Sequence, residues 1–146
     1  VVDSQLVASM LASLSTRTAG SVSAVCLGTP HFSVAEFGEL VGTLGEAHTH
    51  PSVTVIVTTS RSVWAEVQLR GWDMLLGAAG IEVVLDTCTY YLPRSTGVSG
   101  TVMTNSAKWA YYAPGMLDVE VVFASLADCV ASAIAAEVRL SDEVSA

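Results

Sequence analysis

Basic side chains are scarce in this chain of 146 residues, and their scarcity excludes one large class of partners. Lys and Arg together number 6, against 14 Asp and Glu, so the formal net charge is -8 at pH 7. A surface that binds nucleic acid needs clustered cations to neutralise phosphates, whereas the six here are scattered along the chain. The acidity indicates a well-solvated surface. We therefore expect no nucleic-acid partner.

Long hydrophobic runs and paired cysteines are also missing. Hydrophobic residues make up 51% of the chain, but each aliphatic stretch is interrupted before it could span a bilayer, so no membrane partner is expected. Three cysteines without a secretory signal do not resemble a disulfide framework, and they favour a reducing, cytoplasmic setting. The length suits one domain with its own core. Because the chain opens with Val1, we expect residues 1–146 to be a single α/β domain from a longer catalytic chain.

Helical and strand-like segments alternate along the sequence. Ser33 and Glu36 have the spacing of a capping box, which predicts a helix that ends at Leu44. Continuous β-branched and aliphatic runs predict strands that are buried on both faces. Strands are expected over 22–27, 53–57, 81–85, 101–103 and 119–123, and further helices over 4–15, 62–69, 72–79, 106–112 and 125–138, the fourth of these ended by Pro114. This order predicts a three-layer α/β/α domain with a mostly parallel sheet.

Two cysteines follow strands in matched settings. Cys26 lies near the end of the first expected strand, and Cys88 lies just beyond the third. In an open α/β sheet the ligand crevice lies past the carboxyl ends of the strands. Both thiols would then face one rim, where soft thiolate ligands suit a metal ion or an iron–sulfur cluster. A buried cysteine taken alone is more often a small hydrophobic residue, and Cys129, on the apolar face of a helix, is interpreted as core.

Two expected helices begin directly after strands with polar residues that favour an anion. Backbone N–H groups and the helix dipole attract a carboxylate or phosphate at such a position. The candidate substrate-binding residues are Ser60 and Arg61 at the first helix, and Asn105, Ser106 and Lys108 at the second. Ordinary N-capping explains both patterns equally well. The sequence shows no nucleophile–base triad and no glycine-rich phosphate loop, and it offers no catalytic base.

Four motifs in order resemble the carboxyl-terminal part of the catalytic portion of the aconitase X family. With a fifth segment they cover the chain from about residue 21 to residue 138. The segments are Val25-Cys26-Leu27-Gly28-Thr29-Pro30-His31-Phe32-Ser33, Thr58-Thr59-Ser60-Arg61, Asp86-Thr87-Cys88-Thr89-Tyr90, Met103-Thr104-Asn105-Ser106-Ala107-Lys108-Trp109-Ala110-Tyr111-Tyr112-Ala113-Pro114-Gly115 and Ser125-Leu126-Ala127-Asp128-Cys129-Val130.

The resemblance implies an aconitase-type domain of a hydro-lyase, a dehydratase that uses an iron–sulfur cluster. Members of the family include cis-3-hydroxy-L-proline dehydratases and phosphomevalonate dehydratases, in which a large catalytic portion works with a small swivelling domain or subunit. It implies that Cys26 and Cys88 are two cluster ligands and that a third lies outside this chain. The expected substrate is a small hydroxy acid, cis-3-hydroxy-L-proline, with phosphomevalonate as the alternative.

Two other interpretations remain open at this point. The chain could be a non-enzymatic α/β module that binds a small anion and simply buries its cysteines, or a relative of the dehydratases that has lost its cluster. Ligand cysteines should lie close together and be accessible at one rim, whereas core cysteines should be inaccessible. In the dehydratase interpretation, the isolated chain should be inactive because it lacks a third ligand and the partner domains.

Overall fold

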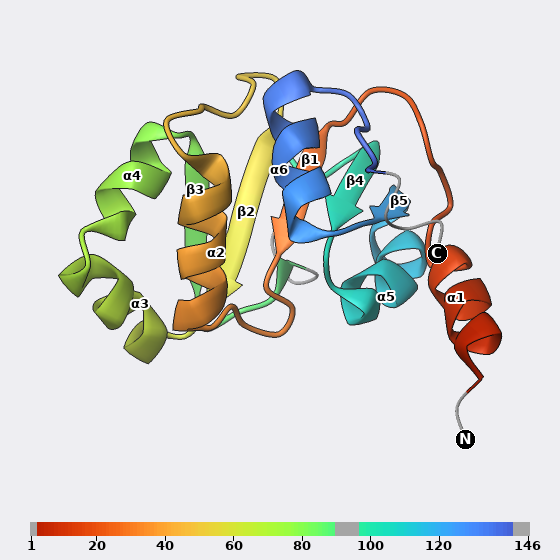
Figure 1. Cartoon of the computed structure of the whole chain (residues 1–146), viewed down its shortest axis with the longest axis horizontal. Helices are drawn as coiled ribbons and strands as arrows, with labels where there is room; N and C mark the ends of the chain where they lie inside the picture. Colours follow the sequence, from red (N-terminus) through yellow and green to blue (C-terminus); the bar gives the residue numbers. More distant parts are fainter. Residues whose placement is uncertain (1–2, 90–96, 142–146) are drawn as a thin grey trace.

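The described residues, 3–89 and 97–141, form a parallel sheet between two helical layers in this computed structural model (Figure 1). The sheet has five strands in the order β3-β2-β1-β4-β5, and every neighbouring pair is parallel. This confirms the predicted fold class. The elements in chain order are α1 (Ser4–Ala12), β1 (Ala24–Leu27), α2 (Val34–Leu44), β2 (Thr54–Thr59), α3 (Arg61–Leu69), α4 (Trp72–Ala78), β3 (Ile81–Leu85), β4 (Thr101–Thr104), α5 (Ala107–Leu117), β5 (Glu120–Phe123) and α6 (Leu126–Ala135).

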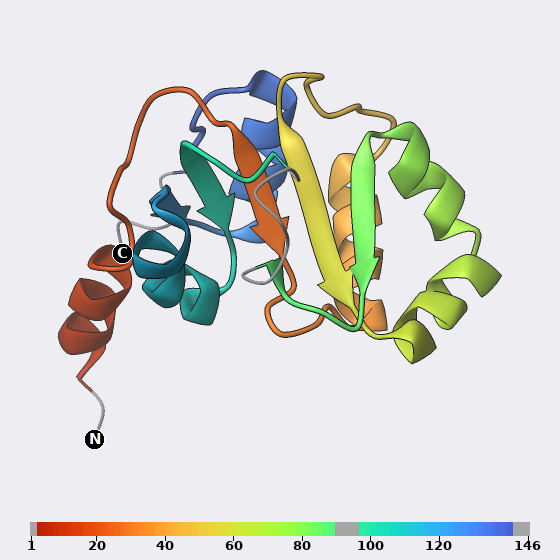
Figure 2. The same ribbon diagram turned by 180° about the vertical axis from the view of Figure 1, so that it is seen from behind.

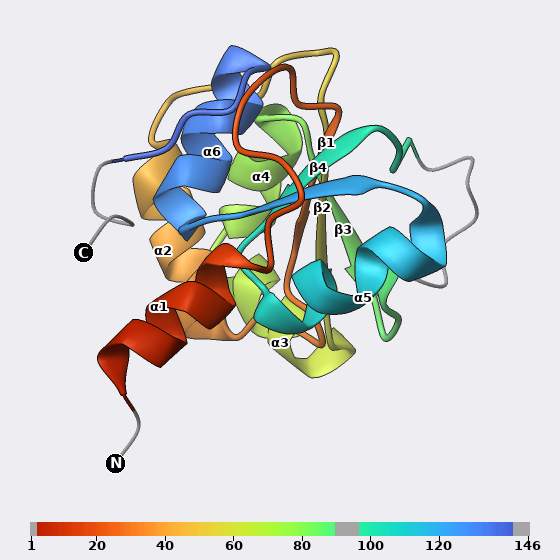
Figure 3. The ribbon, with the colours of Figure 1, turned by 90° about the vertical axis from the view of Figure 1, so that its right-hand side faces the viewer.

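The strand order reverses direction between β1 and β4. The chain steps outward from β1 to β2 and β3, crosses to the other side of β1, and continues outward through β4 and β5. Figure 3 shows the sheet nearly edge-on, with α2 and α6 on one side and α5 on the other. In sheets of this kind the ligand crevice lies at the carboxyl ends of the strands, where the order reverses. The topology therefore places the crevice beyond the ends of β1 and β4.

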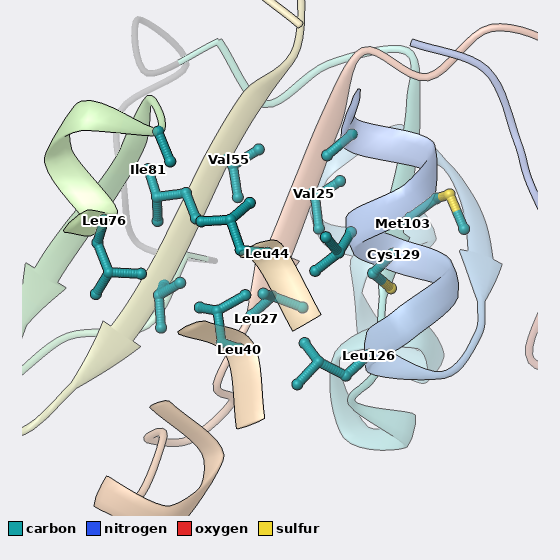
Figure 4. Close-up of a cluster of buried hydrophobic side chains, with 14 of the residues drawn as sticks. Val25, Leu27, Leu40, Leu44, Val55, Leu76, Ile81, Met103, Leu126 and Cys129 are labelled. Atoms are coloured by element: carbon teal, nitrogen blue, oxygen red, sulfur yellow. The ribbon is translucent and has the colours of Figure 1, made fainter. Parts of the chain in front are cut away.

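Alternate residues of β1 enter two separate hydrophobic cores. Val25 and Leu27 face α2 and α6, whereas Ala24 and Cys26 face α5. Figure 4 shows the first cluster, in which Cys129 of α6 lies among aliphatic side chains. Cys129 is completely buried there, which confirms its interpretation as a core residue. None of the described helices is long and apolar enough to cross a membrane.

Helix α5 differs from the sequence prediction because it continues through Pro114 to Leu117. A proline inside a helix removes one backbone hydrogen bond and costs about 3 kcal/mol. The same helix buries Trp109, Ala110 and Ala113 against the sheet, and this packing offsets the cost. The prediction that the helix ends at Pro114 was therefore wrong, because burial of one face outweighs a local breaker.

Helix α1 ends at Ala12, earlier than the predicted 4–15, because the next residues bind the edge strand β5. The Ser15 hydroxyl accepts the N–H of Phe123 at 2.9 Å, and the N–H of Thr16 donates to the carbonyl of Val121 at 2.8 Å. Helix α1 itself buries no residue. The sequence pattern predicted the helix but could not show that the edge strand captures its last residues.

Gly28 makes a close approach that no other residue could make. It follows β1 with a φ of +82°, and a Cβ atom there would lie 2.4 Å from the carbonyl oxygen of Thr58. That oxygen accepts the N–H of Phe32 at 2.8 Å, and the Thr58 hydroxyl donates to the carbonyl of Gly28. The turn after β1 is therefore bonded tightly against the end of β2.

We expect Gly28→Ala to lower the free energy of unfolding by about 3 kcal/mol or more, because the methyl group meets rigid backbone in a left-handed conformation. Gly42→Ala is the control, since Gly42 lies in α2 with open space around it. That variant should gain about 0.5–1 kcal/mol. Chemical denaturation measures both values. Equal stabilities would show that the turn has room for a side chain.

Candidate functional site

Three loops meet at the carboxyl edge of the sheet, and Thr29 lies at their centre. The Thr29 hydroxyl, just beyond β1, lies 3.8 Å from the Sγ atom of Cys88. The Ser106 hydroxyl, just beyond β4, donates to the carbonyl oxygen of Thr29 at 3.0 Å. The loops that follow β1, β3 and β4 are therefore in direct contact at the point where the strand order reverses.

Cys88 reaches this point because the chain turns back after β3. Strand β2 separates β3 from β1, so an extension of β3 would stay about 10 Å from the line of β1. Asp86, the first residue after β3, adopts a left-handed conformation with a φ of 57°. Figure 2 shows the chain leaving the end of β3 and running back along the edge toward β1. The turn brings Cys88 to the loop that follows Cys26.

Cys26 lies under this returning segment. Its side chain is 1% exposed and packs with Trp109 and Ala110 of α5. Burial raises the pKa of the Cys26 thiol to about 12, a hydrogen bond with Thr89 acts in the opposite direction, and the nearby Cys88 raises the pKa further. The Thr89 hydroxyl in turn accepts the indole N–H of Trp109. Cys26 is therefore a neutral thiol at pH 7 in the metal-free chain.

The two cysteines meet only part of what ligand residues were expected to show. Cys26 and Cys88 lie near each other, as expected, and Cys88 is half-buried beside Thr29. Cys26, however, is as inaccessible as a core cysteine. Thiolate binding to a metal requires loss of the thiol proton, and metal binding therefore has to offset the raised pKa of Cys26.

The thiol pair is a partial donor set for a metal centre. Among residues 3–89 and 97–141, no group of three or more His, Cys, Asp or Glu side chains is arranged to hold a metal ion. Soft thiolates fit iron–sulfur chemistry, which commonly uses three or four such ligands. Cys26 and Cys88 therefore fit as two ligands of a cluster whose remaining ligands come from elsewhere.

Ser60 and Arg61 lie at the N-terminus of α3, where an internal carboxylate already binds. The Ser60 hydroxyl caps the helix by accepting the N–H of Val63 at 3.3 Å. Asp86 Oδ1 accepts the backbone N–H of Arg61 at 3.1 Å, and Asp86 Oδ2 lies 2.6 Å from Arg61 Nε. The Arg61 side chain is 81% exposed. The described contacts of this pair run to neighbours at α3 and β3, and none reaches Thr29.

Asn105, Ser106 and Lys108 lie at the N-terminus of α5, next to the cysteine pair. The Ser106 hydroxyl accepts the N–H of Trp109 at 3.2 Å and thereby caps the helix while it also holds Thr29. Asn105 is half-buried, and within the described part of the chain its side chain makes no hydrogen bond. It lines a groove of about 720 Å³ between α1, α2, the end of β5 and the start of α6, and Glu36 and Glu39 of α2 line the same groove. Lys108 is exposed in the first turn.

Sequence reasoning did not assign a role to Asp86 or to the pair Thr89 and Trp109. Asp tolerates the left-handed conformation better than most residues, and this tolerance was the available signal at position 86. In the sequence, Thr89 and Trp109 stood out only as members of longer motifs. Tyr90, which belongs to the same motif, lies outside the described residues.

Comparison with known proteins gives a family. A sequence model of the aconitase X third domain matches residues 22–135. A cis-3-hydroxy-L-proline dehydratase of Pseudomonas aeruginosa is 43% identical over 112 residues, which cover 75% of this chain and 19% of that protein. A protein of the same name from Hypocrea jecorina is 39% identical over 114 residues, 77% of this chain and 19% of that protein. The chain thus spans about a fifth of the length of these relatives.

More distant similarities point in the same direction. The large subunit of a phosphomevalonate dehydratase from Methanothermobacter thermautotrophicus is 31% identical over 99 residues, which cover 68% of this chain and 24% of that protein. The holo-form crystal structure of aconitase X from Thermococcus kodakaraensis superimposes with a TM-score of 0.77 at 20% identity and covers 90% of this chain and 33% of that one. At this identity the structural match establishes the fold alone.

We expect iodoacetamide at pH 8 to modify Cys88 of the native, metal-free chain at least about tenfold faster than Cys26 or Cys129, because Cys88 is only half-buried whereas burial blocks access to the other two thiols and raises their pKa. Trypsin separates the three cysteines into peptides 18–61, 71–94 and 109–139, so mass spectrometry can follow each one. The urea-unfolded chain is the control, in which all three should react alike. Equal native rates for Cys26 and Cys88 would contradict the burial of Cys26.

Proposed function

The chain belongs to the aconitase X family, and from this membership we propose that it is part of an iron–sulfur-dependent dehydratase acting on a small hydroxy acid. The observation that carries the proposal is the approach of Cys88 to the loop after Cys26, at the reversal of strand order. One thiol near the end of β1 and one in the loop after β3 meet at a ligand crevice, and soft thiolates there suit a metal centre.

The proposed substrate is cis-3-hydroxy-L-proline. The relatives named for this substrate are 43% and 39% identical to the chain, whereas the phosphomevalonate dehydratase subunit is 31% identical. Phosphomevalonate is the alternative within the same family. The chain spans about a fifth of the length of the dehydratases it matches. The proposed substrate is therefore that of the whole protein to which this chain belongs.

Cys26 and Cys88 are proposed to hold the cluster, with a third ligand from outside the chain. When bound, the cluster supplies a Lewis acid for the departing hydroxyl. The chain holds Cys88 beside Thr29, while Trp109 orients the Thr89 hydroxyl by donating a hydrogen bond to it. These contacts order the loops around the two thiols before any metal is bound.

The substrate carboxylate is proposed to bind at the N-terminus of α5. Asn105 and Lys108 supply donors there, and the helix dipole favours the negative charge. Ser106 acts from the same turn and holds the Thr29 carbonyl at 3.0 Å. Ser60 and Arg61 form a second proposed group at the N-terminus of α3, where Arg61 contacts Asp86.

The remaining parts of the proposed enzyme lie in other domains. No residue of the chain is assigned as the base that removes the proton next to the carboxylate, so we assign that base to the rest of the protein. A small swivelling domain or subunit is the proposed partner, and the cytoplasm is the proposed location. The fraction of the relatives that the chain covers supports the requirement for further domains.

The cysteine assignment is tested by anaerobic reconstitution of the full-length protein that carries this chain. Cys26→Ser and Cys88→Ser should each reduce bound iron and dehydration of cis-3-hydroxy-L-proline by about tenfold or more, because each removes a ligand. Cys129→Ser should keep both, since Cys129 lies in the core on the other side of the sheet. Iron content, visible absorption and a coupled assay of dehydration are the measurements.

The parent protein serves as the reference for these variants. A cluster without activity on cis-3-hydroxy-L-proline would retain the iron–sulfur proposal and redirect the assay to phosphomevalonate. Absence of iron in the reconstituted parent would contradict the proposal and favour a small-anion-binding module. Equal iron content in all three cysteine variants would remove the ligand assignment.

Asn105→Ala tests the substrate site separately from the cluster. We expect KM to rise about tenfold, as for loss of one hydrogen bond to a charged group, with iron content unchanged. Thr43→Ala, an exposed position near the end of α2 away from the crevice, is the control. An unchanged KM in Asn105→Ala would exclude this side chain from substrate binding.

A further inference from the structure

Asp86 ties the end of β3 to two neighbouring elements. Its backbone N–H donates to the carbonyl of Thr59 at 2.9 Å, at the end of β2. Its carboxylate bridges two donors of one residue at the start of α3, the backbone N–H of Arg61 at 3.1 Å and the Nε of Arg61 at 2.6 Å. The φ of 57° makes the residue a left-handed turn. Asp86 therefore forms the turn through its backbone and stabilises it through its bonds to Arg61 and Thr59.

The direction of this turn decides where Cys88 lies, because only Thr87 separates it from Asp86. A strand that continued without the turn would move residue 88 about 10 Å further along the axis of β3. Residue 88 would then remain two strands away from β1. In the structure the turn instead brings the Cys88 Sγ atom to 3.8 Å from the Thr29 hydroxyl.

We infer that Asp86 is a positioning residue for Cys88, whose turn and carboxylate hold that thiol where it can share a metal centre with Cys26. The inference rests on the proposed function, in which both thiols are ligands. Asp86 acts through the backbone, since its carboxylate contacts Arg61 and neither cysteine in the described contacts. It is therefore distinct from the ligand set itself.

The contacts of Asp86 differ in strength, and the difference predicts which substitutions it tolerates. The ion pair with Arg61 is largely exposed, with side chains 81% and 44% exposed, so it contributes little by itself. A side-chain oxygen that accepts a helix N-terminal N–H, on a residue that tolerates the left-handed conformation, contributes more. Asn retains both properties, whereas Ala retains neither. Asp86→Asn should therefore replace the native residue well.

The test compares Asp86→Ala and Asp86→Asn in the reconstituted full-length protein. Loss of a residue that orients a metal ligand commonly lowers metal affinity or activity by 10–100-fold, so Asp86→Ala should retain about tenfold less iron after desalting than the parent. Asp86→Asn should restore iron content and the visible absorption spectrum of the parent. Rescue by the conservative variant separates the carboxylate geometry from its charge.

Asp118→Ala is the matched control. Asp118 also has a left-handed backbone, with a φ of 54°, but it follows α5 before β5, at the opposite edge of the sheet. Within the described part of the chain its side chain makes no hydrogen bond or ion pair. The two alanine variants therefore carry similar turn strain, and Asp86→Ala should lower Tm further because it also loses the bonds to Arg61. Only Asp86→Ala should lower iron content.

A second measurement needs no cluster. In the metal-free chain, Asp86→Ala should raise the rate at which iodoacetamide modifies Cys88 by about tenfold, because a thiol released from its position beside Thr29 becomes more accessible to the reagent. Asp118→Ala and Asp86→Asn should leave that rate at the parent value. If the parent protein binds no iron, the proposed function fails, while this labelling experiment still decides whether Asp86 positions Cys88.

Two outcomes would overturn the inference. One is parental iron content and parental Cys88 labelling in Asp86→Ala. The other is an equal loss of iron in Asp86→Ala and Asp118→Ala, which would show that general turn strain, and not the bridge to Arg61, affects the site. Loss of iron and altered labelling confined to Asp86→Ala, with rescue by Asp86→Asn, would support it.

Discussion

Because parallel strands all begin at the same edge of a sheet, the chain has to return from the carboxyl edge to the amino edge after every strand that another follows. The candidate site depends on how the return from β3 begins. The other returns between strands of the described sheet run through helices, namely α2, the pair α3 and α4, and α5. The return after β3 instead begins with a turn along the carboxyl edge. Residues 86–89 bring the chain back to the loop after β1, where the Cys88 Sγ atom lies 3.8 Å from the Thr29 hydroxyl. A residue at the start of the return is thereby placed against the loop that follows Cys26.

This constraint explains what the sequence could and could not predict about the site. The five strands and their parallel arrangement followed from buried β-branched runs, and the shared edge of Cys26 and Cys88 followed from their positions after strands. Their proximity was expected only on the interpretation that both are ligands; the strand positions alone do not require it, because β2 lies between β1 and β3. Proximity depends on the left-handed backbone of Asp86. The left-handed conformation of a single Asp is hard to predict from the sequence, since Asp is common in turns of many kinds.

The errors at helix ends have a similar origin. Local residue preferences predicted that α5 ends at Pro114 and that α1 continues to residue 15. Tertiary contacts decided both cases, through burial of Trp109 under α5 and through the bond between Ser15 and the edge strand β5. The capping box of Ser33 and Glu36 was correctly predicted because all of its partners lie within four consecutive residues. Patterns that are complete within one turn are predictable, whereas those that need a distant strand are not.

The burial of Cys26 reconciles two descriptions that the sequence presented as alternatives. In the metal-free chain it behaves as a core residue, since it is 1% exposed and its pKa is raised to about 12. In the proposed enzyme the same thiol is a ligand. Binding of the metal centre then requires the thiol to lose its proton, although the buried site disfavours the charged thiolate. A thiolate is stabilised there only when a metal cation compensates for the lost solvent. The environment of Cys26 therefore favours either a neutral thiol or a metal-bound thiolate over a free thiolate, and a free thiolate is the form most readily oxidised or alkylated.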